Sequence, residues 1–209
     1  MNRRLAALLV AASFLSCSHG ATHKKVPELS SLEGKKVALV GVDGEETARK
    51  VVEVALINQL SLRGTFILVS QEDLETAKAS PAQDPTDWKG LAKRAGADFA
   101  LRAKVLNFDA DERQGYSEET VEDSVIAEEQ GEENAKTTHL YKVKSLTGHV
   151  KVQLDFTDVK SSETRSAVAE AKDITTEEGK TQAAHLPPRL RYLENLSNQA
   201  FAKFFDQYN

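Results

Sequence analysis

The sequence predicts an α/β (α+β) domain in which helices pack on a mixed β-sheet. Two continuous apolar runs, at 37–42 and 65–69, are typical of strands that are covered on both faces. Between them, residues 48–60 repeat apolar side chains at three- and four-residue spacing, as one face of a helix does. Asp43 and Glu46 are expected to cap this helix, which completes a β-α-β unit. Later in the chain, strict alternation of apolar and polar residues predicts strands with one exposed face.

Local signals predict two short helices after this unit. Ser70 and Asp73 form a capping pair at the start of the first one. The segment 80–86 contains two prolines and is expected to be a loop. Asp87 is expected to cap the second helix, whose apolar face carries Trp88. We interpret Trp88 as an anchor of the core.

The second half of the domain contains three further strands and a helix. Residues 99–105 and 150–156 alternate between apolar and polar side chains, and a turn at 160–163 leads into a weaker strand at 164–174. Residues 190–208 place leucines and aromatic residues along one helical stripe, which is typical of core packing. The expected order is therefore β-α-β-α-α-β-(acidic arm)-β-β-α, without an internal repeat.

The composition changes abruptly between residues 109 and 135, which contain eleven acidic residues and one arginine. So few apolar residues lie here that the segment cannot bury enough surface to order itself. We expect the insertion at 109–135 to be disordered, either as a mobile arm or as a long hairpin loop. Its acidic residues are candidates for steering a partner protein: Asp111, Glu112, Glu118, Glu119, Glu122, Asp123, Glu128, Glu129, Glu132 and Glu133.

The N-terminus has the pattern of an export signal. Two arginines precede an apolar stretch at 5–15, which is shorter than the ~20 residues that a membrane-spanning helix needs. The sequence Phe14-Leu15-Ser16-Cys17 resembles the processing box of bacterial lipoproteins, although Phe14 departs from the usual leucine. In such proteins the cysteine receives a diacylglycerol and becomes the new N-terminus. The alternative is an ordinary secretory signal with an incidental cysteine.

Removal of this signal would leave a lipid-anchored chain. Residues 1–16 would be cleaved, residues 17–31 would form a flexible tether, and 32–209 would form one domain. Ser18, in place of Asp, resembles the outer-membrane sorting pattern of Gram-negative lipoproteins. We therefore expect an outer-membrane lipoprotein that faces the periplasm and contacts the membrane through the lipid anchor at Cys17 alone.

Composition and motifs argue against several functions. The formal charge of −5 repels phosphate groups, so nucleic acid is not an expected partner. No motif for nucleophilic catalysis, phosphate binding or a zinc site is present, so we expect neither an enzyme nor a cofactor. Asn107, Asp109, Asp111 and Glu118 have the spacing of calcium ligands in an EF-hand loop, but Glu112 occupies the position that requires glycine. No metal site is predicted.

Three segments together resemble a known family. They are ALINQLSLRGTFILVSQEDLE at 55–75, LAKRAGADFALRAKV at 91–105 and GHVKVQLDFTDVKSSETRSA at 148–167. With the lipoprotein box, they resemble the periplasmic domain shared by curli-secretion lipoproteins and by the lipoprotein activator of penicillin-binding proteins. Ser70-Gln71 stand where that family usually has an arginine, and the last segment has no glycine at its turn.

The resemblance implies a non-catalytic domain that binds a protein partner in the envelope. One hypothesis is an interaction module in envelope assembly or in the regulation of peptidoglycan synthases, whose acidic arm steers a cationic partner. The arm is equally interpreted as a disordered spacer without a partner. The alternative is a curli-type secretion-channel subunit that forms an outer-membrane oligomer. Eleven carboxylates in the arm oppose this alternative, because charged side chains at bilayer depth are costly. The sequence leaves the partner and the oligomeric state open.

Overall fold

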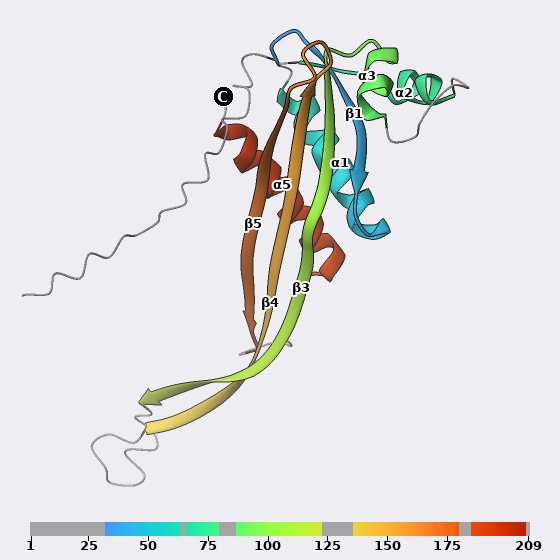
Figure 1. The fold of residues 1–209 in the computed structure, drawn as a ribbon. Helices are drawn as coiled ribbons and strands as arrows, with labels where there is room; N and C mark the ends of the chain where they lie inside the picture. The colour runs from blue at the N-terminus through green and yellow to red at the C-terminus, as the bar shows by residue number, and fades with distance from the viewer. Residues whose placement is uncertain (1–31, 64–65, 80–86, 123–135, 180–184, 208–209) are drawn as a thin grey trace, which may run out of the picture.

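The computed structural model describes residues 32–63, 66–79, 87–122, 136–179 and 185–207. These residues form a mixed five-stranded sheet with the strand order β2-β1-β3-β4-β5 (Figure 1). β1 is parallel to β2 and to β3, whereas β3, β4 and β5 are antiparallel neighbours. The strands are β1 (Lys36–Asp43), β2 (Ile67–Leu68), β3 (Phe99–Glu122), β4 (Lys136–Asp158) and β5 (Thr164–Glu178).

Four described helices pack on this sheet, and the predicted α+β class and element order are confirmed. Two long helices lie together on one face of the sheet, and two short helices lie beside β1 at the opposite side (Figure 1). The long pair is α1 (Glu46–Arg63) and α5 (Arg189–Asp206), and the short pair is α2 (Gln71–Lys78) and α3 (Trp88–Arg94). No helix in the described part of the chain is long and apolar enough to cross a membrane.

The main core lies between the sheet and the two long helices. Alternate residues of β3 and β4, such as Leu101 and Leu154, are fully buried against Phe201 and Phe205 of α5. This confirms the alternation that the sequence predicts for these strands. Tyr192 of α5 lies over Gly148 of β4, where a Cβ would come within 2.5 Å of the tyrosine ring.

A smaller core joins α2 and α3 to the other face of β1. Its outer boundary is Trp88, whose ring lies 4.9 Å from the guanidinium of Arg102 in β3. Trp88 is half-buried and packs against this core at its border, in line with its predicted role as a core anchor. Asp43 was expected to cap α1, but its carboxylate lies 2.6 Å from Arg102 instead. Side-chain pairing across β1 and β3 has therefore replaced the predicted capping contact.

The other predicted helix starts are confirmed. The Ser70 hydroxyl accepts a hydrogen bond from the N–H of Asp73, and the Asp87 carboxylate accepts one from the N–H of Gly90. The predicted turn between β4 and β5 is also present, and Ser162 adopts a positive φ of 62° within it.

The acidic insertion requires a correction over its first half. Residues 109–122 were expected to lack regular structure, but they continue β3 and pair with residues 136–149 of β4 without a register shift. The ladder runs from Asp109 opposite His149 to Glu122 opposite Lys136. The prediction considered only buried apolar area, whereas here cross-strand hydrogen bonding orders the chain. Residues 123–135 lie outside the described residues.

Candidate functional site

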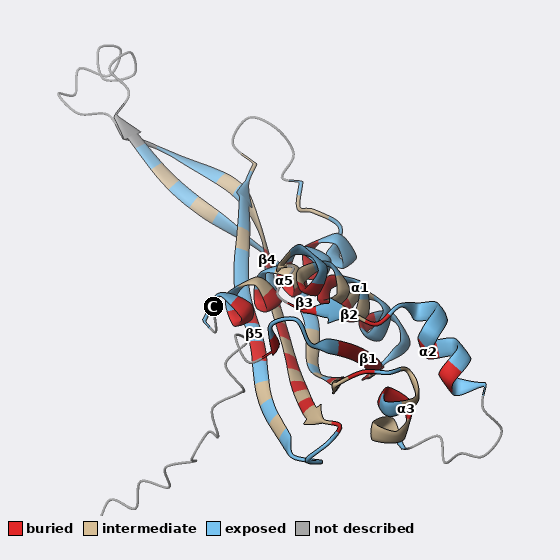
Figure 2. Ribbon diagram, turned by 90° about the horizontal axis from the view of Figure 1, so that it is seen from above, coloured by how far each residue is buried: buried red, intermediate tan, exposed pale blue. Residues whose placement is uncertain are grey.

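The hairpin arm, residues 109–122 of β3 with residues 136–149 of β4, packs against α5 at its base and extends beyond the helices over its outer part (Figure 1). β5 accompanies β4 only as far as the pair Val143–Glu178, and beyond this pair the two strands curve away from the domain (Figure 1). In this outer part the described residues on one face of the ribbon are exposed, whereas most of those on the other face are half-buried (Figure 2). A two-stranded ribbon with no helix against it has surface available for a partner.

The two strands of the arm carry opposite charge. The described β3 side chains include four carboxylates beyond Asp109, whereas residues 138–149 of β4 contain lysines and histidines but no acid. No acidic residue of β3 therefore faces another acid across the ladder: Glu118 lies opposite Leu140, and Glu119 lies opposite His139. Lys144 Nζ lies 3.9 Å from Glu112 Oε1. Pairs of this kind avoid the like-charge repulsion that would open the hairpin.

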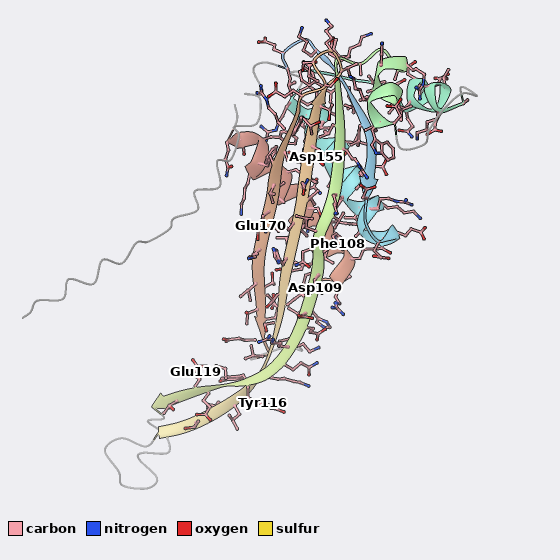
Figure 3. All side chains as sticks on the ribbon, in the orientation of Figure 1. Phe108, Asp109, Tyr116, Glu119, Asp155 and Glu170 are labelled. Carbon is pink, nitrogen blue, oxygen red and sulfur yellow. The ribbon has the colours of Figure 1, made fainter. Side chains whose placement is uncertain are left out.

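Large exposed side chains lie on the same ribbon. Tyr116 is 76% exposed and Leu140 is 65% exposed, and both belong to the face that continues the α5 side of the sheet. On the other face, the rings of His139 and Tyr141 are 6.3 Å apart. Figure 3 shows Tyr116 and Glu119 on the part of the arm that lies beyond the helices. The arm thus combines charged groups with aromatic contact area, which is typical of protein interfaces.

At the base of the arm, a polar network crosses the sheet on the face opposite α5. Asn107 Nδ2 lies 2.7 Å from His149 Nδ1, and His149 Nε2 lies 2.8 Å from Glu170 Oε1. Because an amide nitrogen only donates, Nδ1 accepts and Nε2 carries the proton that is donated to Glu170. Lys172 and Lys151 lie 3.1 Å and 3.7 Å from the same carboxylate. The Lys172 and His149 hydrogen bonds hold the pKa of the Glu170 carboxyl below its usual range.

This network does not have the arrangement of a hydrolytic site. Both ring nitrogens of His149 are already engaged, and no serine, threonine or cysteine is among its hydrogen-bond partners in the described residues. A hollow of about 370 Å³ lies at the opposite end of the sheet, near Asp98 and Asp158. There Asp98 accepts from the N–H of Lys36, and Asp158 accepts from two N–H groups of its own turn. Both carboxylates therefore stabilise the fold.

The EF-hand spacing in the sequence does not correspond to a calcium loop in the structure. The four residues all lie in β3: Asn107, Asp109, Asp111 and Glu118. Because a strand rises ~3.3 Å per residue, the first and last of them are about 36 Å apart along the strand. A single ion cannot reach both ends. No group of three or more potential metal ligands lies together among the described side chains.

The predicted site residues fall into two groups. Asp111, Glu112, Glu118 and Glu119 lie on the described arm, and Glu122 is the last residue of β3. The lipid-attachment candidate Cys17 lies outside the described residues, and so do the remaining acidic candidates: Asp123, Glu128, Glu129, Glu132 and Glu133. Sequence reasoning missed the basic strand that pairs with the acidic one. The absence of acids from residues 136–149 was the available signal.

No family model matches the chain, and no curated protein matches its sequence. Among solved structures, the chain is similar to the PelC dodecamer from Paraburkholderia phytofirmans, at 12% identity and a TM-score of 0.38, covering 81% of this chain and 87% of that one. It is similar to the C-terminal domain of LpoB from Salmonella enterica, at 17% identity and a TM-score of 0.37, covering 71% of this chain and 93% of that one. It is also similar to a minor lipoprotein from Acinetobacter baumannii, at 11% identity and a TM-score of 0.39, covering 84% of this chain and 91% of that one.

At these identities and TM-scores, the similarities establish neither a family nor a function for this chain. Both the curli-secretion branch and the penicillin-binding-protein-activator branch of the resemblance stay predictions.

Proposed function

We propose that this chain is an outer-membrane lipoprotein, anchored through Cys17, that binds an envelope protein with its hairpin arm and catalyses no reaction. The observation that carries this proposal is the arm itself. β3 and β4 remain paired from Asp109–His149 to Glu122–Lys136 although most of this ribbon packs against no helix. A ribbon with little buried area contributes little to folding, so its regularity is best explained by a role in binding.

The side chains of the arm favour a cationic partner. Glu118 and Glu119 point to opposite faces of the ribbon, so both faces present carboxylates near its outer part. Exposed charges of one sign raise the rate at which an oppositely charged partner is encountered, and salt screens this effect. Tyr116 then offers aromatic area for the contact itself.

A secretion-channel subunit is the weaker candidate. Strands that face lipid need an apolar side chain at every second position on one face. The α5-side face of the arm carries Glu112, Glu118 and Lys142, and the opposite face carries Asp111 and Glu119. Neither face has the required pattern, which supports a position of the arm in water.

The proposal is tested by shortening the arm without disturbing the core. Replacing residues 114–144 with Asn-Gly would join Arg113 to Ser145 through a two-residue turn and leave the buried Leu146 in place. Crosslinking in intact cells, followed by mass spectrometry, should recover a specific envelope protein with the unaltered chain and at least tenfold less with the shortened one.

A matched variant separates charge from length. Glu118→Gln with Glu119→Gln keeps the whole arm and should slow association mainly at low salt. Recovery of the partner in equal amounts with the shortened chain and the unaltered chain would overturn the proposed function. Finding Cys17 unacylated by mass spectrometry would overturn the anchor.

A further inference from the structure

The hairpin arm has a long strand edge that no described strand covers. β1 pairs with β3 only up to Asp43 opposite Lys104, after which the same edge of β3 continues for the length of the arm. One irregularity, between Val105 and Asn107, precedes this stretch, and the arm itself has neither a register shift nor a proline in β3. Bulges, prolines and charged side chains are the usual devices that prevent another strand from pairing with an edge, and this edge of β3 has only the charged side chains.

The direction of the backbone groups on this edge follows from the hydrogen bonds of β4. The carbonyl of Lys142 accepts from the N–H of Gly179, so even-numbered residues of this part of β4 bond toward β5 and odd-numbered residues bond toward β3. In the register of the arm, odd residues of β4 lie opposite odd residues of β3. The even residues of β3 therefore direct their N–H and C=O groups outward: Glu112, Gln114, Tyr116 and Glu118.

One contact supports this assignment and indicates what such an edge accepts. The carbonyl of Ala110, the preceding even residue, accepts a hydrogen bond from the guanidinium of Arg189 at the start of α5. The first outward carbonyl of the arm is thus already occupied by a cationic donor of the chain itself. Beyond Ala110, the outward groups extend past the end of α5.

The charge along this edge selects its occupant. Residues 111–119 contain four acidic residues and one arginine, divided between the two faces of the ribbon. The free edge of β5 in a second copy carries four acids against two bases in residues 164–178, so pairing with it would place like charges side by side. Pairing with β5 of a second copy is therefore disfavoured, and a basic strand is favoured.

We infer that a cationic, extended segment of the partner protein adds to the arm as a further strand, bonding to the outward groups of Glu112, Gln114, Tyr116 and Glu118. Backbone hydrogen bonds would provide affinity, and alternate side chains would provide specificity. Glu112 and Glu118 lie six residues apart on one face with Tyr116 between them. The segment should thus carry two basic residues six positions apart, with an apolar or basic residue between them. This inference rests on the proposed function and specifies how the arm binds.

A synthetic probe tests strand addition on the unaltered full chain. The probe is an 11-residue peptide with lysine at alternate positions and threonine or valine between them. Two control peptides have the same sequence and the same charge. One carries N-methyl groups on its odd-numbered backbone amides, and the other carries them on its even-numbered backbone amides. We expect binding by the unmodified peptide and at least tenfold weaker binding by one of the methylated forms. Equal binding by all three would mean a purely electrostatic contact and would overturn the inference.

Two proline variants test which edge is used. Gln114→Pro removes an outward N–H of β3 without removing a β3–β4 hydrogen bond, and Leu140→Pro does the same on the opposite edge, beyond the end of β5. Gln114→Pro should weaken peptide binding at least tenfold, whereas Leu140→Pro should change it less than twofold. Equal effects of the two variants would contradict the assignment.

Amide exchange measured by NMR on the unaltered chain keeps the test independent of the variants. The N–H groups of residues 112, 114, 116 and 118 should become protected when the peptide binds, and their odd-numbered neighbours should change little. Absence of this alternation would overturn strand addition. Loss of partner capture on shortening the arm, together with normal capture by Gln114→Pro, would leave the proposed function standing and reject this inference alone.

Discussion

Among single residues, Gly148 sets how closely α5 packs on β4. A Cβ at this position would lie 2.5 Å from Tyr192 Cε1 and 3.0 Å from Leu196 Cδ2. Gly148→Ala should therefore lower the free energy of unfolding by about 1–3 kcal/mol, since the helix must move to relieve the overlap. Urea denaturation followed by circular dichroism measures this.

Gly115→Ala is the matched control for this substitution, because it lies in the same hairpin and a Cβ there would meet no atom within 4 Å. Its effect should stay within about 0.5 kcal/mol. Similar losses in the two variants would show that packing against Tyr192 is not the cause.

Asp158 makes the β4–β5 turn dependent on pH. Its Oδ1 accepts from the N–H groups of Ser161 and Lys160, both at 2.8 Å, and the Ser161 hydrogen bond contributes most to holding the pKa of Asp158 below its usual range. A lowered pKa in the folded state adds stability above the unfolded-state value of about 3.9, and this stability is lost as the pH falls through the folded-state pKa.

Asp158→Asn should therefore cost about 0.5–1 kcal/mol at pH 7, and the difference from the unaltered protein should shrink below pH ~4. Chemical denaturation at several pH values measures this difference. Glu177→Gln, at the exposed end of β5, controls for the loss of one negative charge. A cost that stays constant with pH would refute an ionic origin.

At the scale of elements, the attachment of α3 to the sheet depends on Arg102. Its guanidinium lies over the Trp88 ring and beside the Asp43 carboxylate, so it links α3, β1 and β3. Trp88 is the only tryptophan, and its fluorescence therefore reports on this junction alone. Arg102→Ala should shift the emission to longer wavelength and cost about 1 kcal/mol. Arg113→Ala, on the exposed arm, should leave the spectrum unchanged.

The elements differ in how far the sequence predicts them. The β-α-β unit and the caps at Ser70 and Asp87 follow from local patterns, and the structure confirms them. The capping role of Asp43 and the contact of Trp88 with a guanidinium could not be predicted correctly, because both depend on Arg102 from a strand that is distant in sequence. For the arm, composition suggested disorder over residues 109–122. Register, which decides whether acid faces acid or base, is a property of two segments together.

At the scale of the whole molecule, the start of the domain and the hairpin arm lie at opposite ends of the sheet. β1 and β3 start at one end, beside the β4–β5 turn, and the arm leaves the other end (Figure 1). Along β3, from Phe99 to Glu122, the chain extends about 75 Å at ~3.3 Å per residue. A lipid at Cys17 would hold the first end near the bilayer, because the tether expected at residues 17–31 would have a reach of only ~20 Å. The arm would then be presented away from the membrane.

This arrangement predicts which end meets the partner. A photo-crosslinking amino acid at Tyr116, on the arm, should capture the envelope protein in intact cells, whereas the same group at Ser161, in the β4–β5 turn, should capture at least tenfold less. Both positions are exposed, so the difference would reflect location and not accessibility. Stronger capture at Ser161 would mean that the partner binds near the membrane, and it would remove the reason for a projecting ribbon. Addition of salt should weaken capture at Tyr116, because exposed carboxylates of the arm are screened at physiological ionic strength over about 8 Å.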